Sequence, residues 1–305
     1  MDALRTRPEV ARAFDSLTID IPPNATPDAF LGIVRDLMDR YGGADPERAL
    51  RGIEVVPVDA GGVAAEYLIP PTVRTDRRFV YLHGGAWIAG GLKAYRLLGA
   101  ELARASGCAV LVVDYRLAPE HPFPAGLDDA TAAFDWARAN GPGGPGQAEV
   151  CLSGDSAGAN LAAALCVRRL AKAGTLPHRL ALLCGVLDLD NVGDVARHDP
   201  LCSAASLAGS IGLYTQGRIA LDDPLVSPIK AASDILARFP PTLVQVSGAE
   251  YLLGGSRRFA ARLIDAGART VLSVWPDMPH SWQCFVDTLP EAKGALGEIA
   301  DFFNA

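Results

Sequence analysis

Short apolar runs bounded by turn-forming residues recur along the chain and give the strongest structural signal. They do not alternate with polar residues, which is typical of strands buried on both faces of a parallel sheet. The predicted central strands are residues 80–82, 109–113, 150–152, 181–187, 242–246 and 271–275. Residues 53–58 and 64–69 predict a leading hairpin around the Ala60-Gly61-Gly62 turn.

Helical patterns separate these strands, at residues 94–105, 127–139, 159–171 and 256–266. Strands that alternate with helices predict an α/β fold, with a mostly parallel central sheet flanked by helices and right-handed crossovers. No internal repeat and no separate second domain is predicted.

Two segments depart from this alternation. Residues 1–50 are predicted as irregular chain with one helix at about 28–41, and residues 188–228 as short helical pieces between polar breaks. Ligands of open α/β sheets bind at the carboxyl edge of the strands. We therefore expect residues 1–50 to form an N-terminal cap segment over a main domain of residues 51–305, with a cap insertion around residues 188–228.

Composition narrows the partners and the location. The 305 residues are 50% hydrophobic and carry a net charge of −7, which argues against nucleic acid or an anionic membrane surface as a partner. The amino-terminal residues lack the apolar core of a secretory signal, and no apolar run is long enough to span a bilayer. We expect a cytoplasmic protein without membrane insertion. The six cysteines are scattered and predict neither a disulfide framework nor a metal site.

A serine lies between a predicted strand and a predicted helix, in the segment Gly154-Asp155-Ser156-Ala157-Gly158. This is the pattern of a nucleophile elbow. The residues two before and two after the serine must lack bulk for so tight a turn, which explains both glycines. Such a turn raises the serine hydroxyl above the sheet. Ser156 is the predicted nucleophile.

A serine hydroxyl attacks only when donors stabilise the oxyanion that results. The segment His83-Gly84-Gly85-Ala86-Trp87 follows a predicted strand, and its small residues allow consecutive N–H groups to face one site. With the N–H of Ala157, those of Gly84, Gly85 and Ala86 are the predicted oxyanion hole. A plain glycine turn is the alternative. We expect a structural role for the His83 ring, in bracing this loop.

The serine also needs a base, and the chain has five histidines. In α/β-hydrolase order the histidine follows the nucleophile and the acid, which leaves His178, His198 and His280. His178 lies in a polar connection and His198 in the proposed cap. His280 follows a predicted strand and is the predicted base.

The third member of such a triad is an acid that precedes the histidine. Glu250 follows the predicted strand 242–246 and is the first candidate. Asp277 is the rival, although it is so near His280 in sequence that reaching the outer ring nitrogen is awkward. Asp265 lies on a predicted helix, facing solvent. The acid would hold the histidine tautomer and stabilise the imidazolium.

Four segments together resemble the hormone-sensitive-lipase-like family of bacterial esterases, within the α/β-hydrolase fold. They are HGGA at 83–86, DYRLAPE and HPFPA at 114–125, GDSAGAN at 154–160 and DPLVSP at 223–228. They occur in the family's order over roughly residues 50–305. The resemblance implies Ser156 as nucleophile, His280 as base, the acid at position 250 and oxyanion donors from Gly85, Ala86 and Ala157. It also implies an N-terminal helical cap.

The chain departs from the family at two positions. Alanine stands at position 86, where the family usually has glycine, and glutamate stands at position 250, where aspartate is more frequent. Arg116 is expected to be structural, and Asp155 to be a hydrogen-bond partner rather than the catalytic acid. Some apolar residues are candidates for an acyl or alcohol pocket, with ordinary core packing as the alternative: Trp87, Leu207, Leu213, Tyr214 and Trp282.

The resulting expectation is hydrolysis of short- to medium-chain acyl esters through an acyl-enzyme, with no cofactor or metal. The preference for such substrates comes mainly from the resemblance, and related enzymes are often dimers. A lactone hydrolase or an amide or formamide deacylase is the alternative, because the segment 83–87 also resembles the His-Gly-Gly-x-Trp of formamidases with this fold. A ligand receptor on an inactive hydrolase scaffold is a further alternative.

Overall fold

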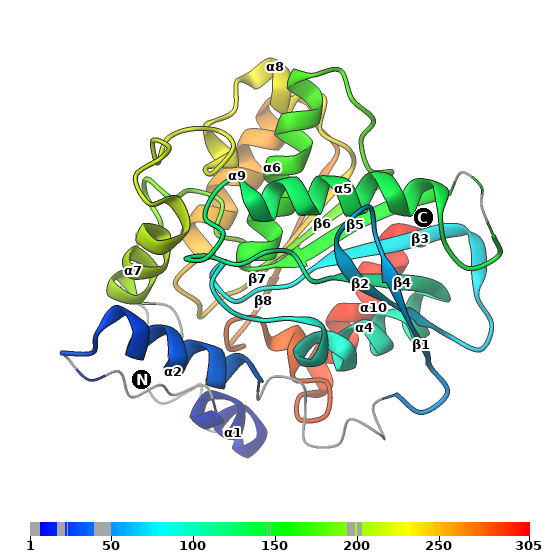
Figure 1. Ribbon diagram of the computed structural model, residues 1–305, viewed down its shortest axis with the longest axis horizontal. Coiled ribbons are helices and arrows are strands. Elements are labelled where there is room, and N and C mark those ends of the chain that lie inside the picture. Colours follow the sequence, from blue (N-terminus) through cyan, green and yellow to red (C-terminus); the bar gives the residue numbers. More distant parts are fainter. Residues whose placement is uncertain are drawn as a thin grey trace.

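The computed structural model describes residues 7–16, 22, 24–39, 50–144, 146, 148–193, 199 and 203–305. Within these residues the centre of the molecule is an eight-stranded sheet in the order β1-β2-β4-β3-β5-β6-β7-β8 (Figure 1). The strands β3 to β8 pair in parallel. β2 pairs antiparallel with both β1 and β4. The predicted α/β fold with a mostly parallel sheet is confirmed.

The predicted strands all form, with shifted ends. The parallel strands are β3 (Arg74–Leu82), β4 (Cys108–Val113), β5 (Glu149–Asp155), β6 (Arg179–Leu183), β7 (Thr242–Ser247) and β8 (Thr270–Trp275). The hairpin strands are β1 (Glu54–Asp59) and β2 (Ala64–Ile69). β6 ends earlier than the predicted residue 187, because Cys184 adopts a left-handed conformation with φ 49° that an extended strand cannot accommodate.

Helices cover both faces of the sheet, as Figure 1 shows. One face carries α4 (Leu92–Ser106) and α10 (Pro290–Asn304), and the other carries α5 (Ala125–Ala139), α6 (Ala157–Ala171) and α9 (Leu253–Asp265). Shorter elements are α8 (Ser233–Leu236) and the 3-10 helices η2 (Pro228–Lys230) and η3 (Trp282–Cys284). The central strands β4 and β7 are buried along their whole length, as their apolar runs predict.

The last strand, β8, corrects one expectation. Among the described strands it pairs only with β7, and it forms an edge of the sheet. Three of its apolar side chains are exposed: Val271, Leu272 and Val274. An apolar run alone does not distinguish a central strand from an edge strand, so the expectation that this strand is buried on both faces was wrong.

The amino-terminal segment holds two helices in its described part, α1 (Pro8–Ser16) and α2 (Pro27–Asp39). The sequence predicts only the second, and the predicted end at residue 41 lies outside the described residues. Arg35 of α2 donates from Nε to the carbonyl of Ile88 (2.9 Å) and pairs with Glu120 (2.8 Å). Because these residues follow β3 and β4, α2 lies over the carboxyl edge of the sheet.

The segment after β6 contains one longer helix, α7 (Ala204–Thr215), which begins with a capping box between Ser203 and Ser206. Its last turn is attached to the segment between β4 and α5, because the N–H of Phe123 donates to the carbonyl of Tyr214 (2.8 Å). The division into a cap and a main domain stays a prediction. No helix in the described ranges is both long enough and apolar enough to cross a lipid bilayer.

Candidate active site

The turn that carries Ser156 has the geometry of a nucleophile elbow. β5 ends at Asp155, α6 begins at Ala157, and Ser156 between them has φ 53° and ψ −117°. A non-glycine residue holds such a strained conformation only where its surroundings enforce it. A Cβ on Gly154 would lie 2.6 Å from the carbonyl oxygen of Leu82, and one on Gly158 would collide with the same atom. Both glycines are therefore required for the elbow to pack against β3.

Three backbone N–H groups around the elbow are available for an oxyanion. Gly85 and Ala86 both have positive φ (114° and 54°), which turns this loop sharply after β3. Within the described residues, the N–H groups of Gly85, Ala86 and Ala157 have no hydrogen-bond acceptor. The N–H of Gly84 differs, because it donates to Asp155 Oδ1 (2.9 Å) and to the Tyr95 hydroxyl (3.0 Å). Of the four predicted oxyanion donors, the Gly84 N–H is thus already hydrogen-bonded within the protein and does not face the substrate.

His83 braces this loop, as the sequence predicts. Its ring is fully buried and stacks on Tyr115 with centroids 4.2 Å apart. Nδ1 lies 2.7 Å from the carbonyl oxygen of Gly84, and Nε2 has no partner among the described residues. Burial lowers the pKa of His83 to about 4, because an imidazolium here would be desolvated. His83 is therefore a neutral, structural histidine.

His280 and Glu250 form a buried pair. Glu250 follows β7 and His280 follows β8, so both lie at the carboxyl edge of the sheet. His280 Nδ1 lies 2.6 Å from Glu250 Oε2, and the two residues are 5% and 1% exposed. The second carboxylate oxygen, Oε1, accepts from the N–H of Ser247 (2.7 Å). Glutamate in place of the family's aspartate thus reaches the histidine and still accepts a hydrogen bond from the backbone of β7.

The rival residues lie elsewhere. Asp277 is exposed, and Asp265 is exposed at the end of α9. His178 precedes β6 at the amino edge of the sheet, 3.5 Å from Glu149. His198 lies outside the described residues.

The elbow and the histidine loop meet through the residues adjacent to Ser156 and His280. The hydroxyl of Ser281 donates to Asp155 Oδ2 (2.9 Å). Ser281 has φ 50°, so the chain turns directly after the histidine. Asp155 and Ser281 are both buried, and this contact brings the two loops together.

Cys184, Glu250 and His280 together are a candidate metal site, because one potential ligand atom of each lies within 4.8 Å of the other two. Two ligands of one tetrahedral zinc ion are about 3.3 Å apart. The 2.6 Å contact between Nδ1 and Oε2 is instead that of a charge-assisted hydrogen bond. The arrangement therefore fits an acid–histidine pair better than a metal centre.

The predicted pocket residues separate into distinct environments. Trp87 and Tyr214 stack with centroids 4.5 Å apart and are buried. Leu213 is partly buried against the core, whereas Trp282 belongs to a second cluster with Cys184 and Met278. Leu207 lines a pocket of about 530 Å³ between α7 and the loop after β6. Tyr251, the neighbour of Glu250, lines the same pocket.

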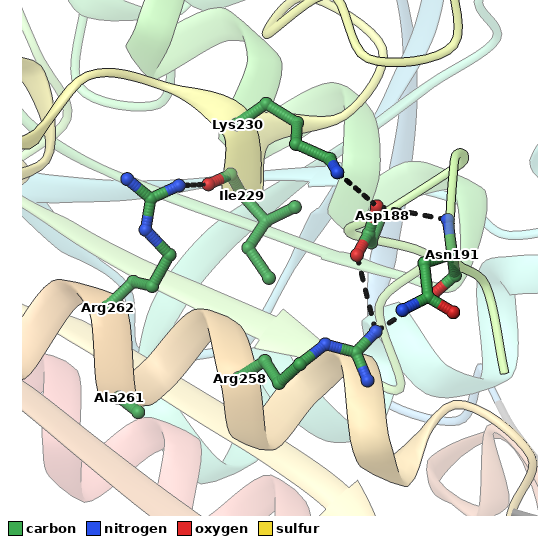
Figure 2. Close-up of a pocket in the computed structure, with 7 residues that line it drawn as sticks. All are labelled: Asp188, Asn191, Ile229, Lys230, Arg258, Ala261 and Arg262. Atoms are coloured by element: carbon green, nitrogen blue, oxygen red, sulfur yellow. Dashed lines mark hydrogen bonds and ion pairs between the residues drawn. The ribbon is translucent and has the colours of Figure 1, made fainter. Parts of the chain in front are cut away.

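A second cleft, of about 460 Å³, lies between η2 and α9. Figure 2 shows that its charged side chains are engaged with the protein. Asp188 forms ion pairs with Lys230 (Oδ1 to Nζ, 3.8 Å) and with Arg258 (Oδ2 to Nη2, 3.3 Å). Arg262 donates a hydrogen bond to the carbonyl of Ile229. These contacts attach the loop after β6 to α9. Arg116 is likewise structural, as predicted, through a bidentate pair with Asp129 (2.9 and 2.7 Å).

The strand order, the strained serine after β5 and the acid–histidine pair after β7 and β8 define the α/β-hydrolase class. A family model described as alpha/beta hydrolase fold matches residues 79–284. An esterase of Acinetobacter venetianus is 37% identical over 254 residues, 82% of each chain. An acetyl-hydrolase of Streptomyces hygroscopicus is 34% identical over 297 residues, 90% of this chain and 95% of the relative.

A solved structure leads to the same class. The structure of an esterase from the bacterial hormone-sensitive lipase family superposes with a TM-score of 0.84 at 34% identity, covering 97% of both chains. The chain therefore belongs to the hormone-sensitive-lipase-like bacterial esterases, a family of serine hydrolases with the α/β-hydrolase fold. The predicted family is confirmed.

Proposed function

We propose that the protein hydrolyses carboxylic esters through a triad of Ser156, His280 and Glu250. The observation that carries this proposal is the buried 2.6 Å contact between His280 Nδ1 and Glu250 Oε2, beside the strained elbow. An acid on Nδ1 keeps the proton on that nitrogen, so Nε2 is the ring nitrogen that accepts the serine proton. The contact between Ser281 and Asp155 supports a position of His280 near Ser156.

The reaction proceeds in two halves. Ser156 Oγ attacks the ester carbonyl while His280 Nε2 takes its proton, and the N–H groups of Gly85, Ala86 and Ala157 stabilise the oxyanion. The imidazolium then protonates the leaving alkoxide, which departs as the alcohol and leaves an acyl-enzyme. Water attacks that acyl group, His280 takes the water proton, and the acid is released as Ser156 is restored. Glu250 stays ionised throughout and stabilises each imidazolium.

The proposed substrates carry short- to medium-chain acyl groups. The pocket lined by Leu207 and Tyr251 borders the loop of Glu250, and its volume of about 530 Å³ suits an acyl chain of modest length. The similarity to an acetyl-hydrolase favours the same class. Lactones, amides and formamides are the alternative substrates.

A panel of p-nitrophenyl esters from acetate to decanoate, run beside a lactone and an N-formyl arylamine, tests this function. We expect the highest kcat/KM on acetate to hexanoate, and complete loss of turnover in Ser156→Ala with the circular dichroism spectrum unchanged. Faster turnover of the lactone or the formamide than of every ester would transfer the assignment to that class.

A homodimer is part of the same proposal. Among the described residues β8 has a neighbouring strand on one side only, and Val271, Leu272 and Val274 are exposed at this sheet edge, without the charged or proline residues that usually protect such an edge. Light scattering after size exclusion should give twice the chain mass. Val271→Lys should then return the monomer mass, whereas a monomer in the unmodified protein would remove this part of the proposal.

A further inference from the structure

The carboxylate of Asp155 is the most densely hydrogen-bonded side chain near the site. Oδ1 accepts from the Tyr81 hydroxyl (3.0 Å) and the Gly84 N–H (2.9 Å). Oδ2 accepts from the Tyr95 hydroxyl (3.0 Å) and the Ser281 hydroxyl (2.9 Å). Asp155 is 1% exposed, so this carboxylate is partnered entirely by the protein.

These donors come from parts of the chain that are distant in sequence. Gly84 belongs to the oxyanion loop, and Ser281 directly follows His280, 126 residues after Asp155. Asp155 itself directly precedes Ser156. One carboxylate therefore contacts the three loops that carry the proposed oxyanion donors, the nucleophile and the base.

The local packing is built around this carboxylate. A Cβ on Gly84 would collide with Asp155 Oδ2 and would lie 2.8 Å from the Tyr95 hydroxyl, so the loop approaches the carboxylate as closely as glycine allows. Burial raises the pKa of Asp155, while the hydrogen bond from Ser281 and the nearby His280 oppose that shift. A buried carboxylate without these donors would be costly, so the loops and Asp155 stabilise one another.

We propose that Asp155 is a positioning residue that couples the oxyanion loop to the histidine loop, through Gly84 on one side and Ser281 on the other. By holding the Gly84 N–H, it directs the next two N–H groups, of Gly85 and Ala86, toward the substrate. By holding the Ser281 hydroxyl, it sets the position of His280 over Ser156. This inference rests on the proposed function, since it assigns how the proposed triad and oxyanion donors are aligned.

The test compares Asp155→Ala, Ser281→Ala and the double variant, with kcat normalised to active sites by the burst from diethyl p-nitrophenyl phosphate. Ser153→Ala is the matched control, because Ser153 is equally buried in β5 and its hydroxyl has no partner among the described residues. A displacement of about 1 Å costs about 100-fold in rate. We therefore expect kcat to fall about 100-fold in Asp155→Ala, about tenfold in Ser281→Ala and less than about twofold in Ser153→Ala. KM should change less than about threefold in each variant.

The double variant identifies the coupling. If Asp155 acts on His280 through Ser281, removing Ser281 from the Asp155→Ala protein has no further effect on kcat. Losses that multiply would overturn the coupling, as would a Ser281→Ala protein as active as Ser153→Ala. The comparison of Ser281→Ala with Ser153→Ala remains decisive if Asp155→Ala does not fold. Turnover by Ser156→Ala would instead refute the proposed function, so the two failures are distinguishable.

Discussion

The exchange Glu250→Gln separates the acid from every other feature of the site, because it keeps size and shape while replacing an anionic acceptor by a neutral amide that also donates. The surroundings determine how the new amide orients. The N–H of Ser247 donates to Oε1 (2.7 Å), so the amide oxygen takes that position and the NH2 group faces His280 Nδ1. A donor facing Nδ1 forces the ring proton onto Nε2. In that tautomer His280 cannot accept the proton of Ser156.

The expected loss follows from this tautomer. A serine hydrolase whose triad carboxylate becomes an amide loses about 10⁴-fold in kcat while its geometry stays intact. We expect a similar loss here, with little change in KM because substrate contacts are untouched. The assay is steady-state hydrolysis of p-nitrophenyl acetate, with the enzyme concentration taken from the absorbance of the folded protein and contaminating wild-type enzyme kept below one part in about 10⁵.

Asp277→Asn is the matched control. It makes the same carboxylate-to-amide change three residues from His280, on an exposed side chain with φ 56°, a conformation that asparagine tolerates. We expect less than a twofold change in kcat. A Glu250→Gln enzyme within tenfold of wild type, or a larger loss in Asp277→Asn, would refute the assignment of Glu250.

Three further outcomes are expected. Gly158→Ala should lower the free energy of unfolding by about 3 kcal/mol in urea titrations, because the new Cβ would collide with the carbonyl oxygen of Leu82. This is the opposite of what the helix propensity of alanine alone would give. The pKa of His83 is about 4 in the folded protein and about 6.5 in the unfolded chain. Between these two pH values the unfolded chain binds a proton at His83 and the folded protein does not. Stability is therefore lost as pH falls from about 6.5 toward 4, by about 2 kcal/mol at pH 5; His83→Asn should lack this loss. Leu207→Trp should fill its pocket and lower kcat/KM on octanoate about tenfold relative to acetate.

The local signals of the sequence were sufficient for the fold and for the acid–histidine pair. A strand, a glycine-flanked serine and a helix specify the elbow because only that turn needs two residues without side chains. The order of nucleophile, acid and histidine, together with a position directly after a predicted strand, then selects Glu250 and His280, which the structure brings into contact. The cytoplasmic location and the division into a cap and a main domain stay predictions.

Other features depend on contacts that the linear pattern does not contain. The four donors to Asp155 come from three separate segments, so a hydrogen-bonded aspartate is predictable but its partners are not. The Gly84 N–H was predicted to face the substrate, and its commitment to Asp155 depends on that network. The helix α1 was missed because it is short and charged, and Val10 and Ala13 are its buried residues among those described.

Covalent labelling of Ser156 tests the central claim most directly. Diethyl p-nitrophenyl phosphate transfers a diethylphosphoryl group to an activated serine and releases p-nitrophenolate. We expect one group per chain, located by peptide mass spectrometry on Ser156, with activity lost in proportion. Labelling should be absent in Ser156→Ala and strongly slowed in Glu250→Gln. Stoichiometric labelling of another residue, or full activity after Ser156 is labelled, would contradict the account.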